Sequence, residues 1–78
     1  MDIDKTVIEI ISEISGKGSI KARDTLQDDI GLDSLAMVML LVSIEKTFSI
    51  ELKESDMNPF DLRTVWDVIY LVQRYYGD

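Results

Sequence analysis

The stretch from Leu35 to Val42 is apolar at every position. A helix made of this stretch has no polar face, so it either lies at the centre of a bundle or meets a partner with its outer side. Seventy-eight residues make one domain, 1–78, near the lower size limit for a self-sufficient core. Full burial of such a helix is hard to arrange in so small a domain. We therefore expect part of its surface to face partner proteins.

Two segments before residue 50 carry helical patterns. The first should run over about residues 2–15, because apolar residues recur there at three- and four-residue spacing. Gly16 then supplies the left-handed stop expected after a last helical residue. The second helix should run over about residues 34–48, with the carboxylate of Asp33 as its N-cap.

The last helix should begin at Thr64 and end at Gly77. The Thr64 hydroxyl and the Asp67 carboxylate approximate a capping box, although Glu or Gln is the usual partner. Before this helix, Asn58-Pro59 has the form of an N-cap followed by proline at the first helical position, which predicts one short helical turn. The predicted fold class is therefore all-α: a small bundle of three main helices plus one short helix.

The connection over residues 16–33 is longer than the ~12–15 residues beyond which a loop is usually functional or disordered. Apolar residues are spaced along it and should pin it to the core, which predicts an ordered loop: Ile20, Leu26, Ile30 and Leu32. Four acids invite comparison with a calcium loop: Asp24, Asp28, Asp29 and Asp33. Their spacing lacks the alternate-position ligands and terminal Glu of an EF-hand, so we predict a solvated acidic loop and no metal site.

Composition excludes several classes of function. The chain has no cysteine and no histidine, so disulfides, His/Cys zinc sites and histidine-based acid–base catalysis are ruled out. No nucleophile–base pair can be drawn, which argues against an independent enzyme. Fifteen Asp and Glu oppose eight Lys and Arg, and the net charge of −7 disfavours nucleic acid and anionic membranes as partners. Basic protein partners are favoured instead.

Targeting signals are not evident in the sequence. No basic leader with an apolar core opens the chain, and no apolar run approaches the ~18 residues of a membrane span. We expect an unprocessed, monomeric protein in the cytoplasm.

Two motifs flank the second helix. Gly31-Leu32-Asp33-Ser34-Leu35 stands where the long loop meets it, and Phe48-Ser49-Ile50-Glu51-Leu52 follows it. With these motifs in this helix order, the chain resembles the acyl carrier protein family, including the carriers of polyketide and peptide synthesis, over nearly its whole length. The resemblance implies that Ser34 carries 4′-phosphopantetheine, donated from coenzyme A by a phosphopantetheinyl transferase. The thiol of that arm would hold acyl intermediates as thioesters.

The resemblance also implies which residues partners recognise. Asp33, the motif acid, should lie near the metal and coenzyme A of the transferase, and Leu35 should contact the transferase. Family members that serve general fatty-acid synthesis usually display several acids on the second helix. Here that surface holds mostly apolar residues and one acid: Ala36, Met37, Met39 and Glu45. This departure suggests a carrier for a dedicated fatty-acid, polyketide or related pathway, whose acyl-loading and acyl-processing enzymes bind through apolar contacts.

Each of these interpretations has an alternative. Ser34 could be an ordinary helix cap, since Ser and Asp are common at that position. Met37 and Met39 could fill the core, and at least one of them should. Four aromatic residues in the last helix suggest packing more than a ligand cage: Trp66, Tyr70, Tyr75 and Tyr76. For the whole chain, the alternative is a non-catalytic helical interaction module with no prosthetic group.

Overall fold

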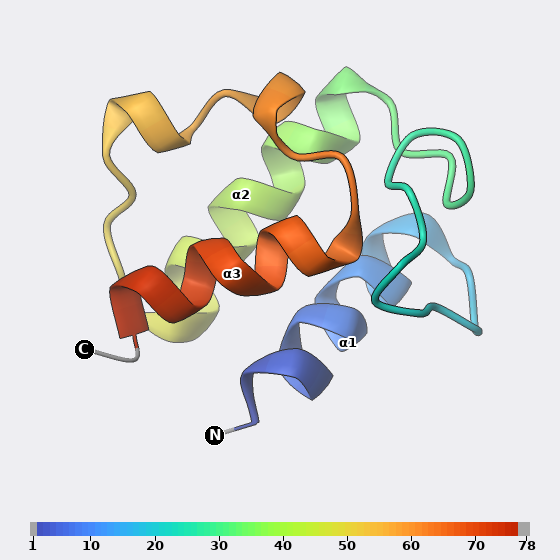
Figure 1. Cartoon of the computed structure of the whole chain (residues 1–78), viewed down its shortest axis with the longest axis horizontal. Coiled ribbons are helices and arrows are strands. Elements are labelled where there is room, and N and C mark those ends of the chain that lie inside the picture. Colours follow the sequence, from blue (N-terminus) through green and yellow to red (C-terminus); the bar gives the residue numbers. More distant parts are fainter. Residues whose placement is uncertain (1, 77–78) are drawn as a thin grey trace.

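The computed structural model describes residues 2–76 and contains three α-helices. Two short 3-10 turns lie in the connection between the second and third helices (Figure 1). The elements are α1 (Ile3–Ser15), α2 (Ser34–Phe48), η1 (Glu54–Asp56), η2 (Pro59–Asp61) and α3 (Val65–Tyr76). Within this part of the chain there is no β-strand, only one isolated bridge between Thr25 and Thr64. The all-α fold class is confirmed, with one short turn more than predicted.

Local signals set both ends of α1, and the stop at Gly16 is the one predicted. The Asp2 carboxylate caps the helix by accepting a hydrogen bond from the Lys5 backbone N–H at 3.2 Å. Gly16 adopts φ 74°, and its N–H donates to the Ser12 carbonyl at 2.8 Å. This left-handed end is where a glycine costs least.

The start of α3 is a reciprocal cap, as predicted. The Thr64 hydroxyl accepts from the Asp67 N–H at 3.2 Å, and the Asp67 carboxylate accepts from the Thr64 N–H at 3.1 Å. The Asn58 side chain caps η2, with Pro59 as the first residue of that turn. The predicted stop at Gly77 lies outside the described residues.

One apolar core joins the three helices and the long loop. α1 packs against both α2 and α3, and α2 also contacts α3. The loop contributes Leu26, Ile30 and Leu32 as buried residues, and Ile20 packs partly buried against the core. The prediction of an ordered loop, pinned by its apolar residues, is confirmed. No helix within residues 2–76 has the length and apolar character needed to cross a bilayer.

The acids of the loop hold its own backbone. The Asp29 carboxylate accepts from the Thr25 N–H and the Asp29 N–H donates to the Thr25 hydroxyl, both at 2.9 Å. The backbone and side-chain hydrogen bonds of Thr25 hold the pKa of Asp29 below its ordinary value. Asp24 similarly accepts from the Lys21 N–H at 2.9 Å. These acids therefore shape the loop, a role that their sequence spacing did not show.

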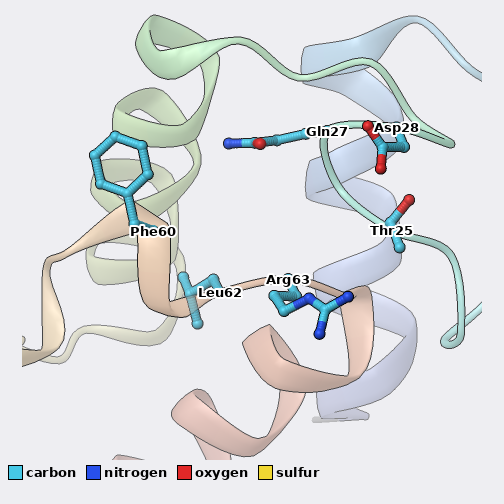
Figure 2. A pocket seen from close by; sticks show the side chains of 6 residues that line it. All are labelled: Thr25, Gln27, Asp28, Phe60, Leu62 and Arg63. Atoms are coloured by element: carbon cyan, nitrogen blue, oxygen red, sulfur yellow. The ribbon is translucent and has the colours of Figure 1, made fainter.

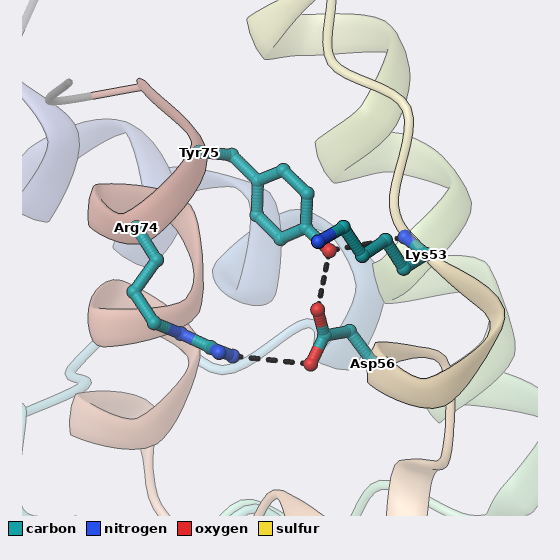
Figure 3. A network of polar contacts seen from close by, with 4 residues as sticks. All are labelled: Lys53, Asp56, Arg74 and Tyr75. Carbon is teal, nitrogen blue, oxygen red and sulfur yellow. Dashed lines mark hydrogen bonds and ion pairs between the residues drawn. The ribbon is translucent and has the colours of Figure 1, made fainter.

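A polar clamp ties η1 to the last turn of α3 (Figure 3). The Tyr75 hydroxyl donates to the Asp56 carboxylate and accepts from the Lys53 backbone N–H at 3.0 Å. Arg74 adds an ion pair to Asp56 at 3.2 Å. The hydrogen bond from Tyr75 is the main reason that the pKa of Asp56 lies below its ordinary value, and the same bond raises the pKa of Tyr75. The clamp holds the α2–α3 connection against the bundle.

We expect Tyr75→Phe to lower the free energy of unfolding at neutral pH and to lose this effect in acid. Because the folded pKa of Asp56 is depressed, its contribution is present above the ordinary value of 3.8 and is lost as the pH falls through the lower folded value. Urea unfolding at pH 7 and at a series of pH values falling well below 3.8 measures the difference. Tyr70→Phe is the matched control, because Tyr70 lies outside the clamp. A destabilisation equal at all these pH values would contradict this role of the clamp.

The aromatic residues of α3 make packing contacts, but not all of these contacts lie in the core. Trp66 and Tyr70 are exposed and stack on each other edge to face, with ring centroids 4.8 Å apart. Tyr76 meets the buried Phe48 at 5.5 Å, also edge to face. Tyr75 belongs to the clamp. All four side chains make contacts, but three of them are exposed on the surface of the bundle: Trp66, Tyr70 and Tyr76.

Candidate functional site at the start of α2

Ser34 is the first residue of α2 and is exposed to solvent. The preceding residue, Asp33, is extended and caps the helix, because its carboxylate accepts from the Ala36 N–H at 2.8 Å. The hydroxyl of Ser34 forms no hydrogen bond with any residue in 2–76. Capping is therefore done by Asp33, as predicted, and the serine oxygen is not needed for it.

The backbone at the start of α2 offers a place for an anion. The first intrahelical bond runs from the Met37 N–H to the Asp33 carbonyl at 2.9 Å. Within the described chain, the N–H groups of Ser34 and Leu35 have no acceptor. Unpaired N–H groups and the helix dipole both favour a negative group here. A phosphate ester on the Ser34 oxygen fits this arrangement.

Gly31 makes the turn that presents the serine. Its φ of 86° lies in the left-handed region, which costs a residue with a side chain more than it costs glycine. No atom lies within 4 Å of a Cβ built at this position, so the backbone angle is what requires glycine. After the turn, Leu32 enters the core while Ser34 stays outside. The glycine thus separates the buried anchor from the exposed hydroxyl.

The outward side of α2 is apolar. Leu35 is 71% exposed and Met39 is 50% exposed. Val38 and Val42 lie beside them, and we call these four residues the outer α2 face. Positions 35, 38, 39 and 42 follow the helical spacing of one stripe. The spacing of Val38 and Val42 relative to Leu35 was visible in the sequence. Because every side of this helix is apolar, the spacing did not show which stripe would be exposed.

Three of the residues that were predicted to contact partners are buried or partly buried in the structure. Met37 is fully buried, with 0% exposure, so the prediction that it contacts partners is wrong. Its side chain lies on the opposite stripe of α2, which packs into the core. Ala36 is partly buried against that core. Glu45 is also partly buried, and its carboxylate accepts from the Leu52 N–H at 2.9 Å. The one acid of α2 is thus already bound within the chain.

A pocket of about 100 Å³ opens between the long loop and the segment leading into α3. Figure 2 shows its lining: Thr25, Gln27, Asp28, Phe60, Leu62 and Arg63. Phe60, on η2, is 74% exposed, although phenylalanine is usually buried. η2 lies beside the first half of α2 (Figure 1). The sequence did not point to this pocket, since its two walls are more than thirty residues apart along the chain.

Comparisons with known proteins agree with this geometry. The family model for the phosphopantetheine attachment site matches residues 5–70. An acyl carrier protein of Thermobifida fusca is 35% identical over 68 residues, covering 85% of this chain and 84% of that protein. A meromycolate extension acyl carrier protein of Mycobacterium tuberculosis is 33% identical over 70 residues. That match covers 87% of this chain but 59% of the relative.

A solved structure agrees as well. An acyl carrier protein from Mycobacterium tuberculosis superposes with a TM-score of 0.83 at 29% identity, covering 92% of this chain and 96% of that one. An interaction module without a prosthetic group does not account for a match to the attachment-site family. The chain belongs to the acyl carrier protein family and is a non-catalytic carrier with a phosphopantetheine attachment site.

Proposed function

We propose that Ser34 is the residue that takes 4′-phosphopantetheine. The observation that carries this proposal is the free hydroxyl of Ser34 at the first position of α2, beside a helix cap supplied by Asp33. A serine that also capped the helix would have its oxygen engaged. Here the oxygen is exposed, and the neighbouring N–H groups can receive the phosphate.

The transfer is a simple exchange at phosphorus. The Ser34 oxygen forms a bond to the phosphorus of coenzyme A that bears the pantetheine, and the pyrophosphate bond to the nucleotide breaks. The serine proton is released and adenosine bisphosphate leaves. A phosphopantetheinyl transferase would catalyse this step. Once attached, the arm supplies a thiol for thioester chemistry to a chain that has no cysteine.

Loading followed by peptide mapping tests the proposal. The wild-type chain, co-expressed with a broad-specificity transferase, is expected to gain the mass of one phosphopantetheinyl group. Fragmentation of the loaded peptide should place that mass on Ser34 and not on Ser43 or Ser49. A chain that stays unmodified while a control carrier is loaded would contradict the proposal, and so would a modification at another serine.

The outer α2 face is our proposed docking surface for acyl-loading and acyl-processing enzymes. Its side chains are apolar and exposed, and α2 places them directly after Ser34. A partner that covers them removes apolar area from water, which favours association without strong electrostatic attraction between the two proteins. We propose on this basis a carrier dedicated to one fatty-acid, polyketide or related pathway, acting as a monomer in the cytoplasm.

We predict that Asp33→Asn slows loading much more than it weakens the fold. Asparagine is as good an N-cap as aspartate, so the stability of α2 should change by no more than about 0.5 kcal/mol. The negative charge beside Ser34 is lost, and with it the proposed contact to the transferase. Loading rates by mass spectrometry and urea unfolding measure the two effects. Asp4→Asn, an equal charge change at an exposed position of α1, is the control. A wild-type loading rate in Asp33→Asn would remove the assigned role.

A further inference from the structure

The pocket between the long loop and the α3 entry presents both donors and acceptors of hydrogen bonds. Arg63 and Gln27 offer N–H groups, and Asp28 offers carboxylate oxygens (Figure 2). The Thr25 oxygen already accepts from the Asp29 N–H, which leaves its own hydrogen to donate. None of the Arg63, Gln27 and Asp28 side chains forms a hydrogen bond with another residue in the described range. The pocket thus matches a ligand that carries both kinds of group.

The pocket also has an apolar wall. Leu62 is buried at its base, and the exposed Phe60 ring stands at its edge. Figure 2 shows the Gln27 side chain extending from the loop toward Phe60. A ligand that covers this ring removes apolar surface from water. Amide groups joined by short hydrocarbon segments satisfy both the polar and the apolar parts of the lining, and a simple anion would meet Asp28 unfavourably.

Backbone hydrogen bonds tie the pocket to the attachment site. The Leu26 N–H donates to the Arg63 carbonyl at 2.8 Å, and the Leu32 N–H donates to the Leu26 carbonyl at 2.9 Å. Leu26 is therefore bonded both to Arg63, in one wall of the pocket, and to Leu32, two residues before Ser34. The arm that we propose on Ser34 would therefore leave the chain from the same hydrogen-bonded segment that carries this pocket wall.

We propose that this pocket is a resting site for the pantetheine arm, with Arg63 and Gln27 binding an amide carbonyl and Asp28 accepting an amide N–H. This inference rests on attachment at Ser34. The pocket, of about 100 Å³, would take one segment of the arm, with the thiol end outside. Tethering supplies an effective concentration on the order of millimolar, so a pocket with only millimolar affinity would hold the arm in about half of the molecules.

Nuclear magnetic resonance of the ¹⁵N-labelled chain, before and after loading, tests the resting site. The backbone amides of Thr25 and Leu62 are the reporters, because they belong to the pocket walls and are not substituted. We expect their signals to move on loading in the wild type. In loaded Arg63→Ala and Gln27→Ala, the movement should fall by at least about half, as expected for a weak tethered contact. Arg23→Ala, another exposed arginine to alanine change, should keep the wild-type movement.

The experiment distinguishes failure of the resting-site proposal from failure of the proposed attachment at Ser34. If the chain loads but only signals at residues 33–36 move, or if Arg63→Ala and Gln27→Ala behave like the wild type, the resting site is wrong and attachment at Ser34 stands. If the chain does not load at all, the attachment proposal itself is wrong.

Discussion

Ser34→Ala is expected to abolish phosphopantetheine loading completely and to leave the fold almost unchanged. The substitution removes the only oxygen that we propose as the acceptor. Stability should change by no more than about 0.5 kcal/mol, as for other surface substitutions, because the serine side chain is exposed and Asp33 caps the helix. Intact-mass analysis after incubation with transferase and coenzyme A measures loading, and urea unfolding measures stability.

The control for this experiment is Ser55→Ala. Ser55 is also exposed and lies in a short helical turn, η1. Ser55→Ala therefore makes the same chemical change at a position that is not the start of α2. It should load like the wild type. Any loading of Ser34→Ala would contradict our assignment, whereas a large loss of stability would show that the serine has a structural role in the start of α2.

Met37→Ala should cost far more stability than Met39→Ala, although the two residues are of one type and lie two positions apart. Met37 is 0% exposed and Met39 is 50% exposed. Truncating a buried methionine to alanine costs about 2–5 kcal/mol through lost transfer energy and the cavity left behind. A domain of this size has only about 3–5 kcal/mol of net stability, so Met37→Ala should lose much of it and unfold at a far lower urea concentration than the wild type. Met39→Ala should stay within about 0.5 kcal/mol of the wild type.

Urea titrations followed by far-ultraviolet circular dichroism compare the two variants directly. Met39→Ala should instead weaken association with an acyl-processing partner, since it removes part of the outer α2 face. Equal stability losses would mean that α2 is rotated relative to the structure described above. An unchanged partner affinity in Met39→Ala would contradict the docking surface.

Much of the helical framework was predictable because its signals are local. Asp33 and Gly16 lie next to the helix ends that they determine. Asn58 caps the short turn η2, and Pro59 is the first residue of that turn. Caps act within three or four residues, so all the residues that form a cap are close together in the sequence. The start of α2 at residue 34 was predicted for this reason.

The turn η1 shows where local signals end. Residues 54–56 have no side-chain cap, and no pattern in the sequence announced a helical turn there. The segment is held by the hydroxyl of Tyr75, nineteen positions away from Asp56. Such a contact exists only when α3 has packed, so it could not be inferred from neighbouring residues.

The sequence by itself determined that α2 starts at Asp33-Ser34 and that a free serine stands at this start, because a helix cap is a local interaction. The tertiary structure alone decided which side of α2 faces outward. A helix that is apolar all round has no polar side to turn toward water, so its own residues do not select the face that is buried. The packing of α1 and α3 makes that choice, burying Met37 and leaving Leu35 and Met39 beside the serine.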